Sequence, residues 1–206
     1  GLREGRLLTL ADSRYVLIEP PHHVYPGRLV DALFNLTVAG YVPILTHPER
    51  LAWINTHYAE ILRLFRGGVW MQITAASLLG KFGKRAQYWS ERMLDEGRVH
   101  ILASDAHDVT KRPVNLRAGR DAAALRVGEQ EAEHMVSTRP RGILANEPPS
   151  ALPMALAVVA GEGSNETGYG NGRVEGISAT ARASRRSTVG SAPLDHTIGR
   201  LRRFFG

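Results

Sequence analysis

Short apolar runs that each end in an acidic residue or a histidine are the feature that most constrains the fold of this chain. One run ends in Glu19, a second in His47, and a third leads into Ser-Asp-Ala-His at residues 104–107. Asp105 and His107 are two positions apart, so on an extended strand their side chains point to the same side. In parallel α/β folds, functional groups gather at the carboxyl ends of strands, where oxygen and nitrogen ligands can surround a divalent ion. The pattern therefore predicts an α/β fold with a metal site at one edge of its sheet.

Strand and helix patterns alternate along the first 145 residues. Strands are expected at residues 14–19, 42–47, 69–73 and 99–104. Helices are expected at residues 27–39, 57–65, 84–96, 129–137 and 140–145. This alternation is typical of a parallel sheet or barrel, because each parallel connection needs a crossover helix.

Four motifs carry a resemblance to a known family. They are Leu-Ile-Glu-Pro around Glu19, Leu-Thr-His-Pro-Glu-Arg around His47, Gln-Ile-Thr-Ala-Ala-Ser-Leu-Leu-Gly-Lys-Phe-Gly at 72–83, and Ala-Ser-Asp-Ala-His at 103–107 followed by Lys-Arg-Pro. In this order they resemble the metal-dependent protein-tyrosine phosphatases of the polymerase-and-histidinol-phosphatase (PHP) superfamily, a bacterial group tied to capsule and exopolysaccharide synthesis. The resemblance covers about residues 5–146.

The resemblance implies a distorted (β/α)7 PHP barrel, to which this chain contributes the later strands. It also implies a cluster of divalent ions, with manganese expected, and the metal ligands Glu19, His47, Asp105 and His107. The implied reaction is hydrolysis of phosphotyrosine on the tail of a bacterial tyrosine autokinase that controls polysaccharide synthesis and export. The family pattern begins with a His-x-His, a further Asp and His, and another Glu, and this chain has no match to that first part. We therefore expect a longer domain, and we expect residues 1–206 alone to bind manganese weakly and to hydrolyse little phosphotyrosine.

Arg50 and Arg112 are the candidate catalytic residues that hold phosphate. A guanidinium forks onto two phosphate oxygens and stays charged at any working pH. One arginine lies three residues after His47 and the other five residues after His107, as in the family motifs. The alternative is a surface ion pair, for Arg50 with Glu49 or with a helix carboxylate. The remaining histidines match no family ligand position, although His22 and His23 could line the mouth of the site.

The chain has no cysteine, which excludes the thiolate nucleophile of cysteine-based tyrosine phosphatases. Two other functions stay open at this point. A PHP phosphoesterase acting on a small metabolite such as histidinol phosphate is one alternative, and the motif at 72–83 argues against it. A non-catalytic binding module that kept the fold and lost its metals is the other, and elemental analysis of the purified protein distinguishes it.

Composition and charge give expectations about partners, location and the limits of the domain. The net charge is +6, and the arginines are not grouped with interleaved aromatics, so no nucleic-acid partner is expected. No apolar run approaches the roughly 18 residues that span a bilayer, which favours a cytoplasmic protein. We place the phosphatase domain at residues 1–147 and a low-complexity, disordered basic tail at 148–206. The end of that tail has near-helical apolar spacing, which suggests weak contact with a membrane surface or a partner, against the alternative of a solvated basic end.

Overall fold

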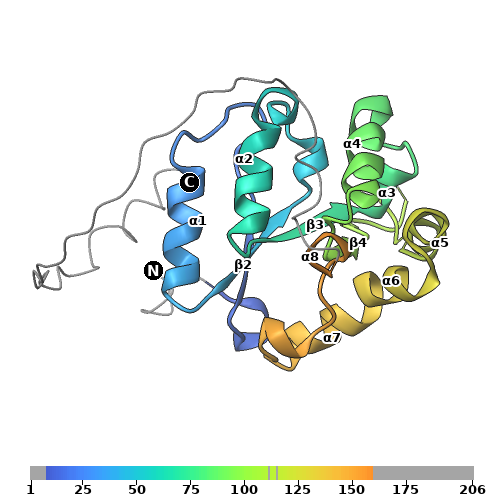
Figure 1. Cartoon of the computed structure of the whole chain (residues 1–206). Coiled ribbons are helices and arrows are strands. Elements are labelled where there is room, and N and C mark those ends of the chain that lie inside the picture. Colours follow the sequence, from blue (N-terminus) through green and yellow to red (C-terminus); the bar gives the residue numbers. More distant parts are fainter. Residues whose placement is uncertain (1–7, 111, 115, 160–206) are drawn as a thin grey trace, which may run out of the picture.

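Four parallel strands form the centre of the protein, in the order β1-β2-β3-β4 (Figure 1). The computed structural model describes residues 8–110, 112–114 and 116–159. The strands are β1 (Tyr15–Ile18), β2 (Val42–Thr46), β3 (Trp70–Thr74) and β4 (Ile101–Ala103). Each strand pairs in parallel with its neighbour. All four carboxyl ends therefore lie at the same edge of the sheet.

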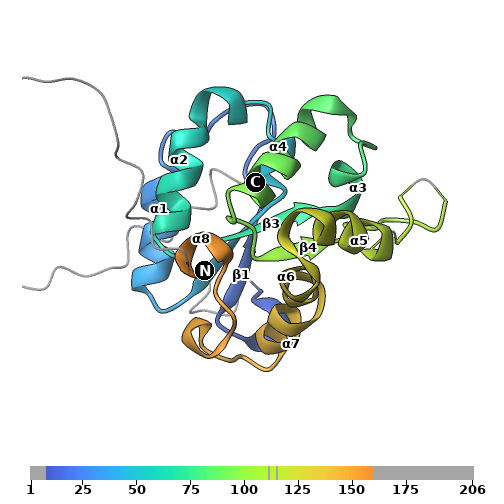
Figure 2. The same cartoon turned by 45° about the vertical axis from the view of Figure 1, so that its right-hand side comes forward.

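Helices connect the strands and continue after them. The helices are α1 (Leu29–Val38), α2 (Ile54–Arg66), α3 (Ala75–Leu78), α4 (Gly83–Asp95), α5 (Leu116–Val127), α6 (Glu129–Glu133), α7 (Arg139–Leu144) and α8 (Leu156–Val159). Figure 1 shows α1 and α2 side by side, with α4 next to α3, and these pairs are also in contact. Figure 2, turned by 45°, shows α5 beside β4, with α6 and α7 following below it.

Alternate strand residues point to opposite faces of the sheet, and on both faces most of them are buried, with Leu17 of β1 exposed. One face packs against α1, α2 and α4 and contributes Val16, Leu45, Met71 and Leu102 to the larger core cluster. The other face forms a smaller cluster made by Tyr15, Val42, Ile44, Trp70, Ile101, Ile143 and Leu152. Continuous apolar strands of this kind are expected in a parallel sheet that is covered on both sides.

The four expected strands and the expected helices are confirmed, with ends that shift by a few residues. Helix α5 was not expected. Most of its apolar residues are alanines, and its buried residues are the small Gly119 and Ala123. The described strands form one four-stranded sheet, so the (β/α)7 barrel stays a prediction.

Residues 148–159, which the sequence analysis placed in the tail, pack against the rest of the described chain. Leu152 and Ala155 are buried, and the Arg139 guanidinium donates hydrogen bonds to the carbonyl oxygens of Pro153 and Met154. Residues 160–206, including the expected amphipathic end, lie outside the described residues, so a disordered tail there stays a prediction. Within the described part, no helix is both long enough and apolar enough to cross a membrane.

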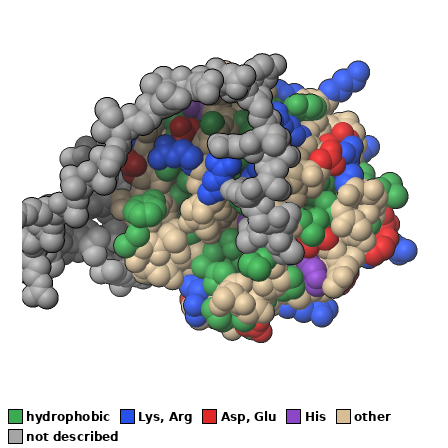
Figure 3. All heavy atoms as spheres, in the orientation of Figure 1, with side chains coloured by type: hydrophobic (Ala, Val, Ile, Leu, Met, Phe, Trp, Pro, Cys, Tyr) green, Lys and Arg blue, Asp and Glu red, His purple; other side chains and the backbone are tan. Residues whose placement is uncertain are grey.

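Surface charge is distributed over the face drawn in Figure 3. The Lys and Arg side chains visible there are spread among hydrophobic and other side chains, and several of them lie beside Asp or Glu.

Candidate metal and phosphate site

The predicted site residues follow three of the four strands. Glu19 comes directly after β1, His47 directly after β2, and Asp105 two residues after β4. Because the strands are parallel, their carboxyl ends bring these residues to one edge of the sheet. This is the edge at which open α/β sheets bind their ligands.

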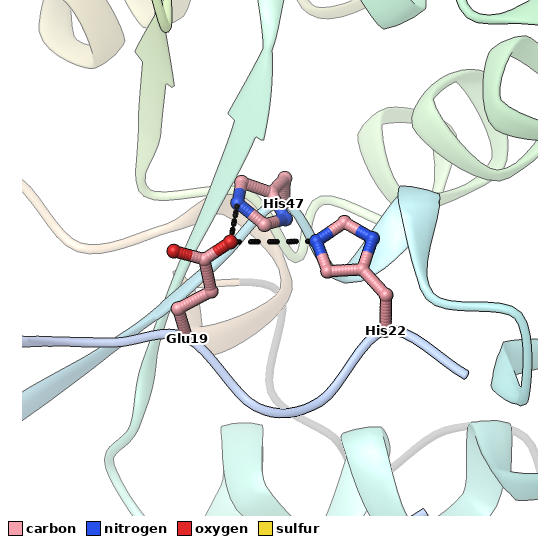
Figure 4. A group of neighbouring side chains, drawn as sticks. All are labelled: Glu19, His22 and His47. Carbon is pink, nitrogen blue, oxygen red and sulfur yellow. Dashed lines mark ion pairs between the residues drawn. The ribbon is translucent and has the colours of Figure 1, made fainter. Parts of the chain in front are cut away.

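Glu19, His22 and His47 form a compact cluster at this edge (Figure 4). Glu19 Oε1 lies 3.3 Å from His47 Nε2 and 3.4 Å from His22 Nε2. One ligand atom from each residue lies within 4.8 Å of the other two. One carboxylate and two imidazoles suit a divalent transition metal, and imidazole is the commonest protein ligand of such ions. The donor set therefore fits a divalent ion, as the pattern of strand ends predicted.

His22 was expected only at the mouth of the site, and the structure brings its ring into the cluster. Its ring centroid lies 5.0 Å from that of His47. The sequence signal was its position three residues after Glu19, in the loop that follows β1. That spacing does not fix the path of a loop, which is why the motif alone could not assign His22.

The environment of His47 favours a neutral imidazole. Burial and the charge of Arg50 lower the pKa of His47, while the Glu19 carboxylate raises it by a smaller amount. Its Nδ1 is buried and has no hydrogen-bond partner in the described part of the chain. The backbone of His47 is left-handed, with φ of 34°, an uncommon conformation outside glycine. A neutral imidazole is the form of histidine that coordinates a metal.

Asp105 lies in a second group, with the two predicted phosphate-binding arginines. Arg50 Nη1 donates to Asp105 Oδ2 at 2.7 Å, and Arg112 Nη2 donates to the same oxygen. Arg112 Nη2 also donates to the Asp105 backbone oxygen at 3.1 Å. The Arg50 backbone N–H donates to the His47 backbone oxygen at 3.0 Å, so the arginine group and the histidine cluster are neighbours.

His107 lies at the rim of the second group. Its side chain is exposed, and Nδ1 is 3.0 Å from the Asp105 backbone oxygen and 3.9 Å from Asp105 Oδ1. The structure thus brings Glu19 and His47 together, and places Asp105 and His107 with the arginines. The role of all four as metal ligands stays a prediction.

Glu49, the surface ion-pair partner in the alternative interpretation of Arg50, lies inside the protein. It is fully buried, and its Oε1 accepts hydrogen bonds from the Thr74 backbone N–H (3.0 Å) and the Ser77 hydroxyl (2.7 Å). Burial raises the pKa of Glu49 to about 7, against the opposing effect of the hydrogen bonds from Ser77 and Thr74. Glu49 therefore ties the turn that carries Arg50 to the end of β3. Nothing in the sequence around Glu49 distinguishes it from an exposed acid.

Comparison with known proteins agrees with the motifs. The chain matches the family described as capsular polysaccharide synthesis, CpsB/CapC, over residues 1–145. CapC of Staphylococcus aureus is 35% identical over 147 residues, which are 71% of this chain and 57% of CapC. The tyrosine-protein phosphatase YwqE of Bacillus subtilis is 37% identical over 111 residues, which are 54% of this chain and 44% of YwqE.

The fold is also similar to solved structures. A chain from the crystal structures of YwqE from Bacillus subtilis and CpsB from Streptococcus pneumoniae superimposes with a TM-score of 0.68 and 30% identity. The match covers 71% of this chain and 59% of that chain, and those proteins are described as unique metal-dependent tyrosine phosphatases. The present chain spans about half of the length of the curated relatives that it matches.

Proposed function

Because the chain belongs to the CpsB/CapC family of capsular polysaccharide synthesis proteins, we propose that it is part of a metal-dependent tyrosine-protein phosphatase. The proposed substrate is the phosphotyrosine tail of a bacterial tyrosine autokinase in the cytoplasm, and the proposed role is control of polysaccharide synthesis and export. The observation that carries the proposal is the arginine pair around one Asp105 oxygen, beside the cluster of Glu19, His22 and His47.

The three-residue cluster supplies the metal-binding half of the proposed site. Glu19, His22 and His47 would hold a divalent ion, with manganese as the proposed metal, and Asp105 and His107 would complete the ligand set. Such an ion, when bound, lowers the pKa of water and offsets the negative charge of phosphate oxygens. His47 contributes an imidazole that stays neutral, because burial and Arg50 lower its pKa.

The arginine pair supplies the phosphate-binding half. Two guanidiniums already converge on a single carboxylate oxygen, which shows that an anion is stable between them. A phosphoryl group presents more oxygens and more negative charge than a carboxylate, so it would bind both guanidiniums through several charge-assisted hydrogen bonds. Arg50 and Arg112 would thus orient the phosphoryl group and stabilise charge that develops during its transfer.

Phosphatase assays on the full-length protein test the proposal. We expect hydrolysis of a phosphotyrosine peptide that stops after treatment with a chelator and returns when Mn²⁺ is added. Asp105→Ala or His107→Ala should abolish this activity and leave the fold largely intact, because polar residues at strand ends contribute little to the core. His134→Gln is the matched control, since His134 contacts Thr138 within the short π-helix His134–Thr138 before α7 and not the site.

Three outcomes would contradict the proposal. Wild-type turnover in Asp105→Ala or His107→Ala would remove the assigned ligands. Equal activity on a histidinol phosphate substrate and a phosphotyrosine peptide would favour the small-metabolite phosphoesterase. Purified protein that retains no manganese, iron or zinc after incubation with excess metal would favour the non-catalytic binding module.

A further inference from the structure

Phe82 lies against both arginines of the proposed phosphate site. The Arg50 guanidinium carbon is 4.3 Å from the centroid of the Phe82 ring, and that of Arg112 is 5.7 Å from it. Both distances fall within the range of about 6 Å in which an aromatic ring attracts a cation. One partly buried ring therefore contacts the two cations that also meet at Asp105.

The segment around Phe82 is shaped to present this ring. Gly80 and Gly83 flank it with φ values of +75° and +85°, a conformation that side chains rarely adopt. Helix α4 begins at Gly83, and Arg85 in its first turn donates to the backbone oxygens of Leu51 (2.7 Å) and Arg50 (3.1 Å). The same segment thus holds both the backbone and the side chain of Arg50.

The ring contacts and the hydrogen bonds use different parts of a guanidinium. The N–H groups of a guanidinium lie in its plane and point outward from its edge. Its attraction to an aromatic ring acts through the face and leaves those donors available. A phosphoryl group that enters between the arginines takes the hydrogen bonds that now go to Asp105. The contacts with Phe82 can persist through that exchange, and Asp105 is then free to act elsewhere in the site.

We propose that Phe82 is a positioning residue that holds Arg50 and Arg112 with their N–H edges open to a phosphoryl group. The inference rests on the proposed function for the identity of the substrate. It adds a residue that touches neither the proposed metal nor the reacting phosphorus and acts through the two guanidiniums.

Inorganic phosphate is the probe, because its binding does not require catalysis. Titration calorimetry on the full-length protein compares wild type with Phe82→Leu, which keeps an apolar side chain and removes the ring, and with Phe82→Tyr, which keeps the ring. Tyr88→Leu is the control, since Tyr88 is an exposed aromatic on α4 that contacts Trp89. We expect Phe82→Leu to weaken phosphate binding about 5- to 30-fold, and Phe82→Tyr and Tyr88→Leu to stay within about twofold. Unfolding midpoints of the four proteins establish that each is folded.

Kinetics separate this inference from the proposed function. On a phosphotyrosine peptide, Phe82→Leu should lower kcat/KM by a similar factor, and Phe82→Tyr should restore it. Unchanged phosphate affinity in folded Phe82→Leu overturns the role of Phe82, even if the wild type is an active phosphatase. Failure of the wild type to bind phosphate overturns it as well. Weakened phosphate binding without any phosphotyrosine hydrolysis by the wild type supports Phe82 and refutes the proposed function.

Discussion

At the scale of single residues, the two strand-end positions His47 and Asp105 have an unusual backbone. Both have positive φ, 34° and 50°, although neither is glycine. Such conformations carry a cost on the order of 1–3 kcal/mol and persist where the surrounding structure enforces them. At these positions the left-handed turn directs a polar side chain to the edge of the sheet where the other site residues lie. The conformation is an observation that no sequence pattern revealed.

Replacing Arg50 or Arg112 by lysine tests whether each guanidinium binds phosphate through two parallel N–H donors. Arg50→Lys and Arg112→Lys keep the positive charge and lose the two parallel N–H donors that match phosphate oxygens. We expect kcat/KM on a phosphotyrosine peptide to fall at least tenfold in each, or about 1.4 kcal/mol of transition-state stabilisation. Arg63→Lys is the control, because Arg63 is an exposed residue of α2 that pairs with Glu60. Unchanged kinetics in both site variants would rule out a bidentate clamp.

The sequence predicted the residues that follow strands better than those on loops. Glu19, His47 and Asp105 were placed at one edge because apolar runs identify strands, and parallel strands align their ends. His22 and Phe82 depend on loop paths, which spacing alone does not determine. The burial of Glu49 arises from residues of β3 and α3 that are distant in sequence, so the residues around it in the chain do not indicate it.

At the scale of elements, the expected helices share an apolar face with helical spacing. Helix α2, for example, buries Tyr58, Ile61 and Phe65 on one side. Helix α5 lacks such a face, because it approaches α3 through Gly119 and its buried positions are the small residues Gly119 and Ala123. Close packing of small residues is a property of two surfaces together, so periodicity in one segment could not reveal it.

Gly119 provides a direct test of the α5–α3 contact. A Cβ added at Gly119 would lie 2.4 Å from the Ala75 Cβ, far inside van der Waals contact. Gly119→Ala should therefore lower the free energy of unfolding by about 1–3 kcal/mol, since an overpacked interface must move apart. Gly27→Ala is the matched control, because an added Cβ there meets nothing within 4 Å. Urea denaturation measures the stability of both variants. A midpoint of Gly119→Ala equal to that of the wild type would show that α5 is not packed closely on α3.

At the scale of the whole molecule, charged groups occur in two settings. The arginines and acids of the site are partly exposed, so they can exchange partners with a ligand. Arg139 is instead fully buried, where it pairs with Glu131 and donates to the backbone oxygen of His100. Its further bonds to the 153–154 backbone join the last described segment to the sheet. Removing one of these partners would leave part of the buried charge of Arg139 uncompensated, which is strongly destabilising. We therefore assign Arg139 a structural role.

His100 makes the stability of this assembly depend on pH. Its ring is buried and stacked on Trp70, and its Nδ1 accepts a hydrogen bond from the Met71 backbone N–H at 3.0 Å. Burial, with the nearby charge of Arg139, lowers the pKa of His100 from 6.5 to about 3. Below pH 6.5 the unfolded chain takes up a proton that the folded protein does not, so the contribution to stability is present above pH 6.5. It is lost progressively as the pH falls toward about 3.

His100→Asn isolates this contribution, because the amide oxygen can accept the Met71 hydrogen bond and does not titrate. Between pH 7 and pH 5 the wild type should lose about 2 kcal/mol more unfolding free energy than His100→Asn, from a slope of ~1.4 kcal/mol per pH unit. Comparing the two pH slopes cancels the contributions of other titrating groups, including Glu49, whose raised pKa stabilises the folded state at lower pH. It also cancels the packing that the smaller side chain loses at every pH. Urea midpoints at pH 7, 6 and 5 measure the two slopes, and parallel curves would mean that His100 takes up a proton in the folded protein as readily as in the unfolded chain.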